Sequence, residues 1–229
     1  MKTLTAITLP LTLSCALATS ALAHEAGDII LRTGFVTVAP NDDSDAIVLP
    51  SDPVTTLPSG VGVGNDTQLS IIGAFMVTDQ WAVELLAATP FEHDIDVPDL
   101  GIDAGSIRHL PPTLSLQWYP RGGQEGWQPY VGLGVNYTYI YDEDIDPALA
   151  DALGSVIGAG SSRLDLDDSF GFAAQAGVDI PLSRNWMLNA GVWYMNIETT
   201  ADVVTDVGTV SFDVDINPWV YNIGIAYKF

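Results

Sequence analysis

Residues 131–141 read VGLGVNYTYIY, and this stretch decides the fold class. Apolar or aromatic side chains occupy its odd-numbered positions, from Val131 to Tyr141. Small or polar residues stand between most of them: Gly132, Gly134, Asn136 and Thr138. A period of two places alternate side chains on opposite faces of a β-strand, whereas a helix would mix the two kinds around its circumference. The stretch therefore predicts a strand with one apolar, aromatic-rich face.

The same alternation recurs in segments of about ten residues, which is typical of strands that cross an outer membrane. The predicted strands are residues 28–38, 67–77, 81–91, 113–119, 131–141, 170–180, 188–195 and 219–229. An even number of antiparallel strands can close into a barrel that leaves no exposed edge.

The connections between these segments alternate in length. Residues 39–66, 92–106, 142–168 and 198–216 are long and acidic, whereas 78–80, 120–128 and 181–185 are short. Outer-membrane barrels have long extracellular loops and short periplasmic turns. The predicted fold is thus all-β, an eight-stranded antiparallel transmembrane β-barrel with both ends in the periplasm. Residues 146–153, inside the third long loop, are compatible with one or two turns of helix.

The first residues have the order of a secretory signal peptide. Lys2 precedes an apolar stretch at 4–18, and the small-residue sequence Ala21-Leu22-Ala23 follows. The apolar stretch is shorter than the roughly 20 residues that a membrane-spanning helix needs. We expect cleavage between Ala23 and His24, which leaves residues 24–229 as one barrel domain. Cys15 lies in the leader, so the mature chain would contain no cysteine.

Charge and hydropathy exclude two classes of protein. The chain has 7 Lys+Arg against 29 Asp+Glu, a formal net charge of −22 at pH 7, so a nucleic-acid partner is excluded. Mean hydropathy is +0.25. After the leader, however, there is no uninterrupted apolar run of about 18 residues, so a helical membrane protein is excluded as well.

Catalytic, metal and cofactor sites have little support in the sequence. His24 begins the predicted mature chain, and His93 and His109 lie near loops without a nucleophile at a motif spacing. The acidic tracts at 142–144 and 165–168 lack the spacing of a calcium-binding loop. We therefore expect no enzyme, no metal site and no cofactor, and interpret the acidic loops as solvated.

Charged residues recur on the predicted inner face near the short turns: Arg32, Glu84, Asp179 and Lys228. Charges in a narrow lumen need partners. We expect a salt-bridged plug at the periplasmic end; alternatively, each charge reaches interfacial water.

Further from the short turns, the inner face becomes small or apolar. The predicted channel-lining and gate residues are Leu86, Ala88, Gly134, Ala173, Trp193 and Met195. Small inward residues would leave space, and an eight-stranded barrel has room for packed side chains or one small ligand. We expect a narrow apolar pocket that opens to the outside above the plug. The alternative is a filled interior.

Longer stretches of the chain resemble the outer membrane protein W (OmpW) family. They are residues 24–28 (HEAGD), 83–91 (VELLAATPF), 109–114 (HLPPTL), 117–119 (QWY), 129–132 (PYVG), 136–138 (NYT), 192–195 (VWYM), 217–220 (NPWV) and 226–229 (AYKF). They occur in order over essentially the whole mature chain, which makes the resemblance specific.

The resemblance implies a porin-like channel that admits small hydrophobic molecules by passive diffusion. Leu86 and Trp193 match positions where family members constrict the channel. Pro111 and Pro112 would interrupt strand pairing, because proline has no backbone N–H. In the mechanism proposed for the family, such gaps let apolar cargo leave sideways into the bilayer.

The resemblance also implies partners and a location. The barrel would sit in the outer membrane of a Gram-negative bacterium, surrounded by lipid and lipopolysaccharide. The alternating aromatic residues that end at Phe229 resemble the signal read by the barrel-assembly machinery. The long loops are more acidic than is usual in the family, which puts partners bound by the loops in doubt.

Two other functions remain open from the sequence. A structural or receptor-type barrel would have a plugged lumen and acidic loops that bind external partners. A lipid-modifying barrel enzyme would need His93 or His109 beside an acid and a hydroxyl group.

Overall fold

The computed structural model describes residues 23–51 and 53–229. Apart from Ala23, the predicted signal peptide lies outside the described residues. Among the described residues, no helix is long and apolar enough to cross a membrane.

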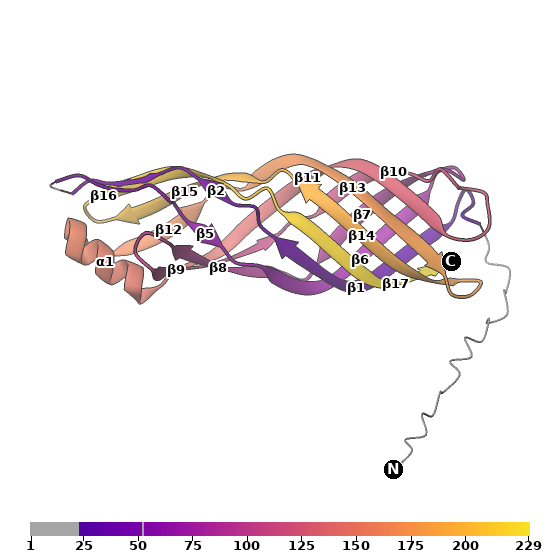
Figure 1. Cartoon of the computed structure of the whole chain (residues 1–229), viewed down its shortest axis with the longest axis horizontal. Helices are drawn as coiled ribbons and strands as arrows, with labels where there is room; N and C mark the ends of the chain where they lie inside the picture. Colours follow the sequence, from indigo (N-terminus) through magenta and orange to yellow (C-terminus); the bar gives the residue numbers. More distant parts are fainter. Residues whose placement is uncertain (1–22, 52) are drawn as a thin grey trace, which may run out of the picture.

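Eight strands form a closed antiparallel barrel, as predicted. They are β1 (Ile29–Ala39), β6 (Asp66–Met76), β7 (Trp81–Ala88), β10 (Thr113–Trp118), β11 (Gln128–Ile145), β13 (Ser169–Pro181), β14 (Trp186–Met195) and β17 (Trp219–Lys228). The hydrogen-bonded order is β10-β7-β6-β1-β17-β14-β13-β11, and pairing of β10 with β11 closes the circle. The barrel occupies the right of Figure 1, with the C-terminus at the end that carries the short turns. We call this the turn end.

The long connections continue the barrel wall beyond its other end. They contain the strands β2 (Asp43–Ser44), β3 (Ile47–Leu49), β4 (Thr55–Leu57), β5 (Gly62–Val63), β8 (Phe91–Val97), β9 (Ile102–Leu110), β12 (Ser162–Leu166), β15 (Glu198–Thr205) and β16 (Gly208–Asp215). One sheet joins β5, β8 and β9 to the far part of β11, another has the order β12-β15-β16-β2, and β3 pairs with β4. We call these strands, together with α1 (Pro147–Ile157), the crown, at the left of Figure 1. The long connections are therefore folded, which the sequence analysis did not predict.

Helix α1 is longer than the predicted 146–153. The Asp146 side chain caps it by accepting a hydrogen bond from the Ala148 amide at 2.7 Å, and Pro147 occupies the first turn, where a missing N–H costs nothing. Gly158 ends the helix with φ 75°, the left-handed conformation that glycine adopts without strain.

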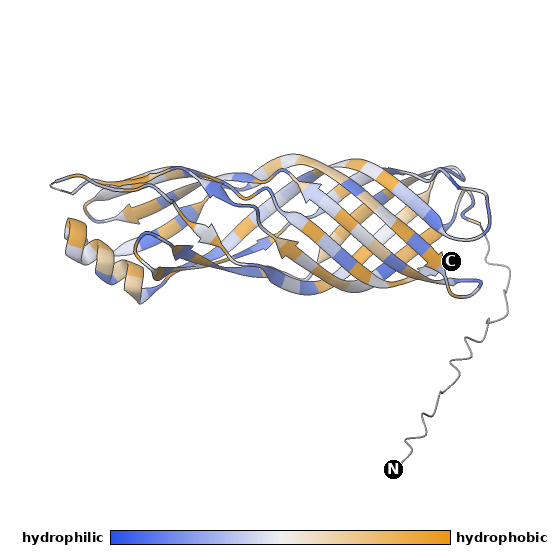
Figure 2. Cartoon of the chain, in the orientation of Figure 1, coloured by the Kyte–Doolittle hydropathy of each residue, from blue (hydrophilic) through white to orange (hydrophobic). Residues whose placement is uncertain are grey.

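The apolar face of the wall changes sides between barrel and crown. Figure 2 shows apolar and polar residues alternating along the barrel strands, and there the apolar ones point outward, as at Leu133, which is 71% exposed. In the crown they point inward: along β8, Ile95 and Val97 are buried whereas Asp94 and Asp96 are exposed. The barrel therefore has the outer surface of a membrane protein, and the crown has the interior of a water-soluble one.

The first and last strands approach closely where they close the barrel. Gly34 of β1 is paired with Gly224 of β17. A Cβ atom on Gly34 would meet the Ile223 carbonyl oxygen, and one on Gly224 would meet the Thr33 carbonyl oxygen. Backbone atoms cannot move aside cheaply, so this closure requires both glycines.

We predict that Gly34→Val destabilises the barrel by about 1–3 kcal/mol, because the added side chain overpacks this contact. Urea unfolding of the refolded protein in lipid vesicles, followed by its heat-modifiable mobility on gels, measures the effect. Gly73→Val is the matched control, since a Cβ at Gly73 meets nothing within 4 Å. Equal stability of the two variants would contradict this account of closure.

Candidate functional site

A buried ionic cluster crosses the lumen near the turn end. Arg32 of β1 donates from Nη1 to Glu84 Oε2 at 2.8 Å and from Nη2 to Asp179 Oδ2 at 2.7 Å. Its Nε donates to Asp179 Oδ1 at 3.1 Å, so the contact with Asp179 is bidentate. All three side chains are fully buried. Strands β1, β7 and β13 thus bring together three of the residues expected to form a plug.

Neutral side chains satisfy the remaining hydrogen bonds of this cluster. Glu84 accepts from the amides of Gln117, through Oε2, and Gln175, through Oε1 at 3.1 Å. Asn189 donates to Asp179 Oδ1 at 2.8 Å, and Tyr119 accepts from Arg32 at 2.7 Å. Buried ion pairs are tolerated only with such partners. We call Arg32, Glu84, Asp179 and these neighbours the polar floor.

The N-terminal segment covers the polar floor from the turn end. The buried His24 ring has its Nε2 3.3 Å from Asp179 Oδ2 and stands edge-on to Tyr119, with ring centroids 5.2 Å apart. Lys228, the fourth expected plug residue, holds this segment: its Nζ lies 3.3 Å from Asp28 Oδ2 and donates to the Ala23 carbonyl at 2.6 Å. The sequence analysis missed His24, because no local signal reveals a contact between residues so far apart in the chain.

An apolar layer lies next to the polar floor on the crown side. Leu86, Ala173, Trp193 and Met195 are buried there in one cluster that continues into the crown, and Ala88 packs against it. These five residues are among those that the sequence analysis expected on the inner face.

The expectation that small inward residues leave empty space at this level is wrong, because the glycines of this layer are closely packed. A Cβ on Gly134 would meet the Ser115 hydroxyl, and one on Gly191 would lie 2.8 Å from the Trp193 ring. These two glycines instead let Ser115 and Trp193 pack closely against the backbone.

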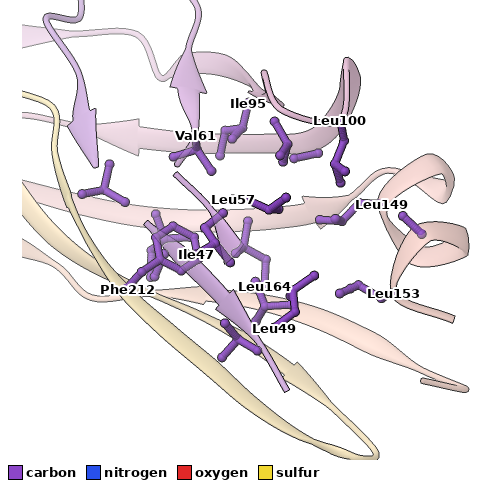
Figure 3. Close-up of a pocket in the computed structure, with 18 of the residues that line it drawn as sticks. Ile47, Leu49, Leu57, Val61, Ile95, Leu100, Leu149, Leu153, Leu164 and Phe212 are labelled. Carbon is purple, nitrogen blue, oxygen red and sulfur yellow. The ribbon is translucent and has the colours of Figure 1, made fainter. Parts of the chain in front are cut away.

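The main apolar cavity lies in the crown (Figure 3). It has a volume of about 110 Å³, and its lining is aliphatic apart from Thr55 and Phe212. It is enclosed by strands from all four long connections and by α1. The residues labelled in Figure 3 are Ile47, Leu49, Leu57, Val61, Ile95, Leu100, Leu149, Leu153, Leu164 and Phe212.

A second, smaller cavity of about 10 Å³ adjoins it on the barrel side. Val63, Ile107 and Ile216 line both cavities, which makes them neighbours. His93 and His109 also line the smaller one. The two histidines therefore lie on the barrel side of the crown cavity.

The two crown histidines face each other. Their Nε2 atoms are 2.9 Å apart, and the two rings are nearly parallel, with their centroids 4.9 Å apart. Desolvation by burial lowers the pKa of His93, and desolvation together with the neighbouring His93 lowers the pKa of His109 to about 3. Both rings are therefore neutral near pH 7. Among the described residues, their hydrogen-bond and ring partners are each other, Phe91 and the Gly64 carbonyl oxygen, which is not the arrangement that a catalytic histidine requires.

The barrel wall has a gap in its strand pairing beside the histidines. Leu86 pairs with Thr113 on one side of the gap, and Phe91 pairs with His109 on the other. Within the described chain, the register has no pair between residues 87–90 and residues 110–112. Pro111 and Pro112 supply no backbone donors there. We call this interruption the wall gap.

The opposite edge of the same segment is bonded. The Tyr137 amide donates to the Pro112 carbonyl at 3.1 Å, and the Asn136 side chain donates to the Pro111 carbonyl at 3.2 Å. The wall gap therefore opens only toward β7 and β8.

In the part of the chain that the structure describes, no group of three or more His, Cys, Asp or Glu side chains is placed to hold a metal ion. The exposed acidic residues of the crown thus remain without an assigned ligand.

We predict that Arg32→Met destabilises the barrel by about 3–5 kcal/mol, because it leaves two buried carboxylates without their cation. Neutralising them as well, in Arg32→Met/Glu84→Gln/Asp179→Asn, should restore part of the stability. Urea unfolding in vesicles measures both effects. Arg108→Met is the control, since it removes only exposed ion pairs, with Glu92 and Asp142, and should change little. An Arg32→Met barrel as stable as this control would refute the account.

Comparison with known proteins gives a consistent result. The OmpW family model matches residues 25–229. Outer membrane protein W of Vibrio cholerae is 43% identical over 212 residues, covering 90% of this chain and 91% of that protein. Outer membrane protein W of Escherichia coli is 40% identical over the full length of both chains. The crystal structure of OprG from Pseudomonas aeruginosa superimposes with a TM-score of 0.77 at 41% identity, covering 91% of this chain and 99% of OprG. The chain therefore belongs to the OmpW family, and it is a non-enzymatic β-barrel of the Gram-negative outer membrane.

Proposed function

We propose that this barrel is a channel for the passive uptake of small hydrophobic molecules. The leader would direct the chain to export, and cleavage before His24 would give the mature barrel. Cargo enters the crown cavity, passes the two histidines to the apolar layer, and leaves sideways through the wall gap.

The observation that carries this proposal is the apolar interior of the crown. The crown projects into water, and its outer face is acidic, yet it encloses a cavity lined by aliphatic side chains. Such a cavity favours apolar guests, because binding removes their apolar surface from water. A crown that served only to bind external partners through its acidic face would need no internal cavity.

The polar floor gives the path its direction. Arg32, Glu84 and Asp179 fill the lumen near the turn end with buried charge. An apolar molecule could pass only by displacing these ion pairs, which is strongly unfavourable. The path therefore turns toward the wall, where Leu86 and Thr113 border the wall gap.

Leu86 and Trp193 act as the gate in this proposal. Both are almost completely buried within the apolar layer. The Trp193 indole Nε1 has no hydrogen-bond partner among the described residues, so the ring can change its position without breaking such a bond.

We predict that Trp193→Ala and Leu86→Ala each speed the uptake of a small apolar fluorophore into proteoliposomes, because each removes a side chain that narrows the path. Protein-free vesicles give the background of permeation through lipid. Trp186→Ala is the control, since Trp186 lies on the outer surface of the barrel. Uptake that none of the gate variants alters would reject the channel in favour of a plugged, receptor-type barrel.

We further predict that Pro111→Val/Pro112→Val slows uptake, because the restored backbone donors allow the wall gap to close. The same vesicle assay measures this effect. Pro129→Val changes a proline of β11 near the turn end and should leave uptake unchanged. If the double variant takes up the fluorophore as fast as the parent barrel, the exit does not lie at the wall gap.

A further inference from the structure

The lining of the crown cavity contains one aromatic ring. The surface of this cavity is entirely apolar, and among the described residues that line it Phe212 has the only ring. An apolar surface offers a guest neither a hydrogen bond nor a charge. The crown cavity can therefore discriminate between hydrocarbons only by their size and shape.

The volume of the crown cavity limits a guest to about one ring. It is about 110 Å³, which is less than the engineered apolar cavity of about 150 Å³ that binds benzene. The adjoining smaller cavity, about 10 Å³, has no room for a second ring. Protein interiors are closely packed, and inserting extra carbon atoms into them is unfavourable. A bicyclic hydrocarbon therefore exceeds the space that the crown provides.

Phe212 is the largest side chain in this lining. Strand β16 alternates, so Val210, Phe212 and Val214 are buried inside the crown whereas the residues between them are exposed. Figure 3 shows Phe212 at the end of the cavity away from Leu149 and Leu153 of α1. Its ring belongs to the buried apolar cluster of the crown, and it fills volume that a guest would otherwise occupy.

A small residue faces Phe212 on the neighbouring strand. Ala201 of β15 pairs directly with Phe212, is buried, and lines the same cavity. The Cβ atoms of such directly opposed residues are about 4.5–5.5 Å apart. Exchanging the two residues would therefore keep one ring in nearly the same part of the cavity.

We propose that Phe212 sets the upper size of the cargo, so that the crown cavity accepts hydrocarbons with one ring, or aliphatic chains of similar volume, and excludes bicyclic ones. This inference rests on the proposed channel function and specifies its substrate class. Replacing the phenyl group of Phe212 by a methyl group frees the volume of one ring, which is the additional space that a bicyclic guest needs.

Two hydrocarbons of different size test the proposal. para-Xylene has one ring and naphthalene has two, and neither carries a polar group. Each is titrated into the mature, methyl-labelled barrel in lipid nanodiscs, and binding is followed by the NMR shift of the Leu153 methyl groups. Leu153 is buried and lines the crown cavity, so these methyl groups report a guest in the cavity rather than in lipid. Comparing the ratio of the two apparent affinities between variants cancels the partitioning of the ligands into lipid.

Three variants separate the volume of the ring from other effects. The parent barrel should bind para-xylene at least roughly tenfold more tightly than naphthalene, the discrimination by size that an apolar pocket provides. Phe212→Ala should abolish this preference and retain para-xylene binding. Phe212→Ala/Ala201→Phe returns a ring from the opposite strand and should restore the preference. Phe212→Val keeps a side chain that favours a strand, so it gives the same test if Phe212→Ala does not fold.

The outcomes distinguish this inference from the function on which it rests. If the parent barrel binds both hydrocarbons equally well, the size limit is refuted and the channel stands. A single variant at Phe212 that binds para-xylene and still excludes naphthalene refutes it equally, as does a double variant that binds naphthalene as Phe212→Ala does. If neither ligand shifts the Leu153 methyl resonances of the parent barrel, both the size limit and the proposed channel fail.

Discussion

The boundary between lipid and water decides which face of the wall is apolar, and the rest of the structure depends on this constraint. Along β11, Leu133 points outward and is exposed, whereas Ile140, closer to the crown, points inward and is 5% exposed. Apolar side chains gain nothing by avoiding lipid, so in the bilayer they can cover the outside. In water the same strand must bury them, and it does so inside the crown. The inversion therefore gives one continuous wall two different interiors.

In the channel that we propose, these two interiors together define the path of the cargo. Inside the membrane-spanning part, the lumen near the turn end is polar and closed by Arg32 with its two carboxylates. Inside the crown, the lumen is apolar and contains a cavity. The wall gap at Pro111 and Pro112 lies between them, where Leu86 of the apolar layer borders it. In the proposed channel, an apolar molecule that descends from the crown thus meets a break in the wall before it meets buried charge.

The sequence predicted the barrel well because alternation is a local property. The eight strands were found within a few residues, and the inward positions of Arg32, Glu84 and Trp193 followed from the same pattern. The crown was missed, although residues 91–97 alternate as clearly, because their apolar side chains are separated by acids and were interpreted as part of a solvated loop. Contacts between distant segments, such as His24 with Asp179, could not be predicted, since nothing local encodes them.

In the proposed channel, apolar cargo occupies the crown and turns aside above the polar floor. Nuclear Overhauser effects between para-xylene and methyl-labelled barrel in nanodiscs test it most directly. The account predicts contacts with the methyl groups of Leu153 in the crown and Leu86 beside the wall gap, and none with those of Ala226, which lies buried near the turn end. Contacts confined to the outward-facing methyl groups, such as those of Leu133, would place the ligand in the surrounding lipid and contradict the account.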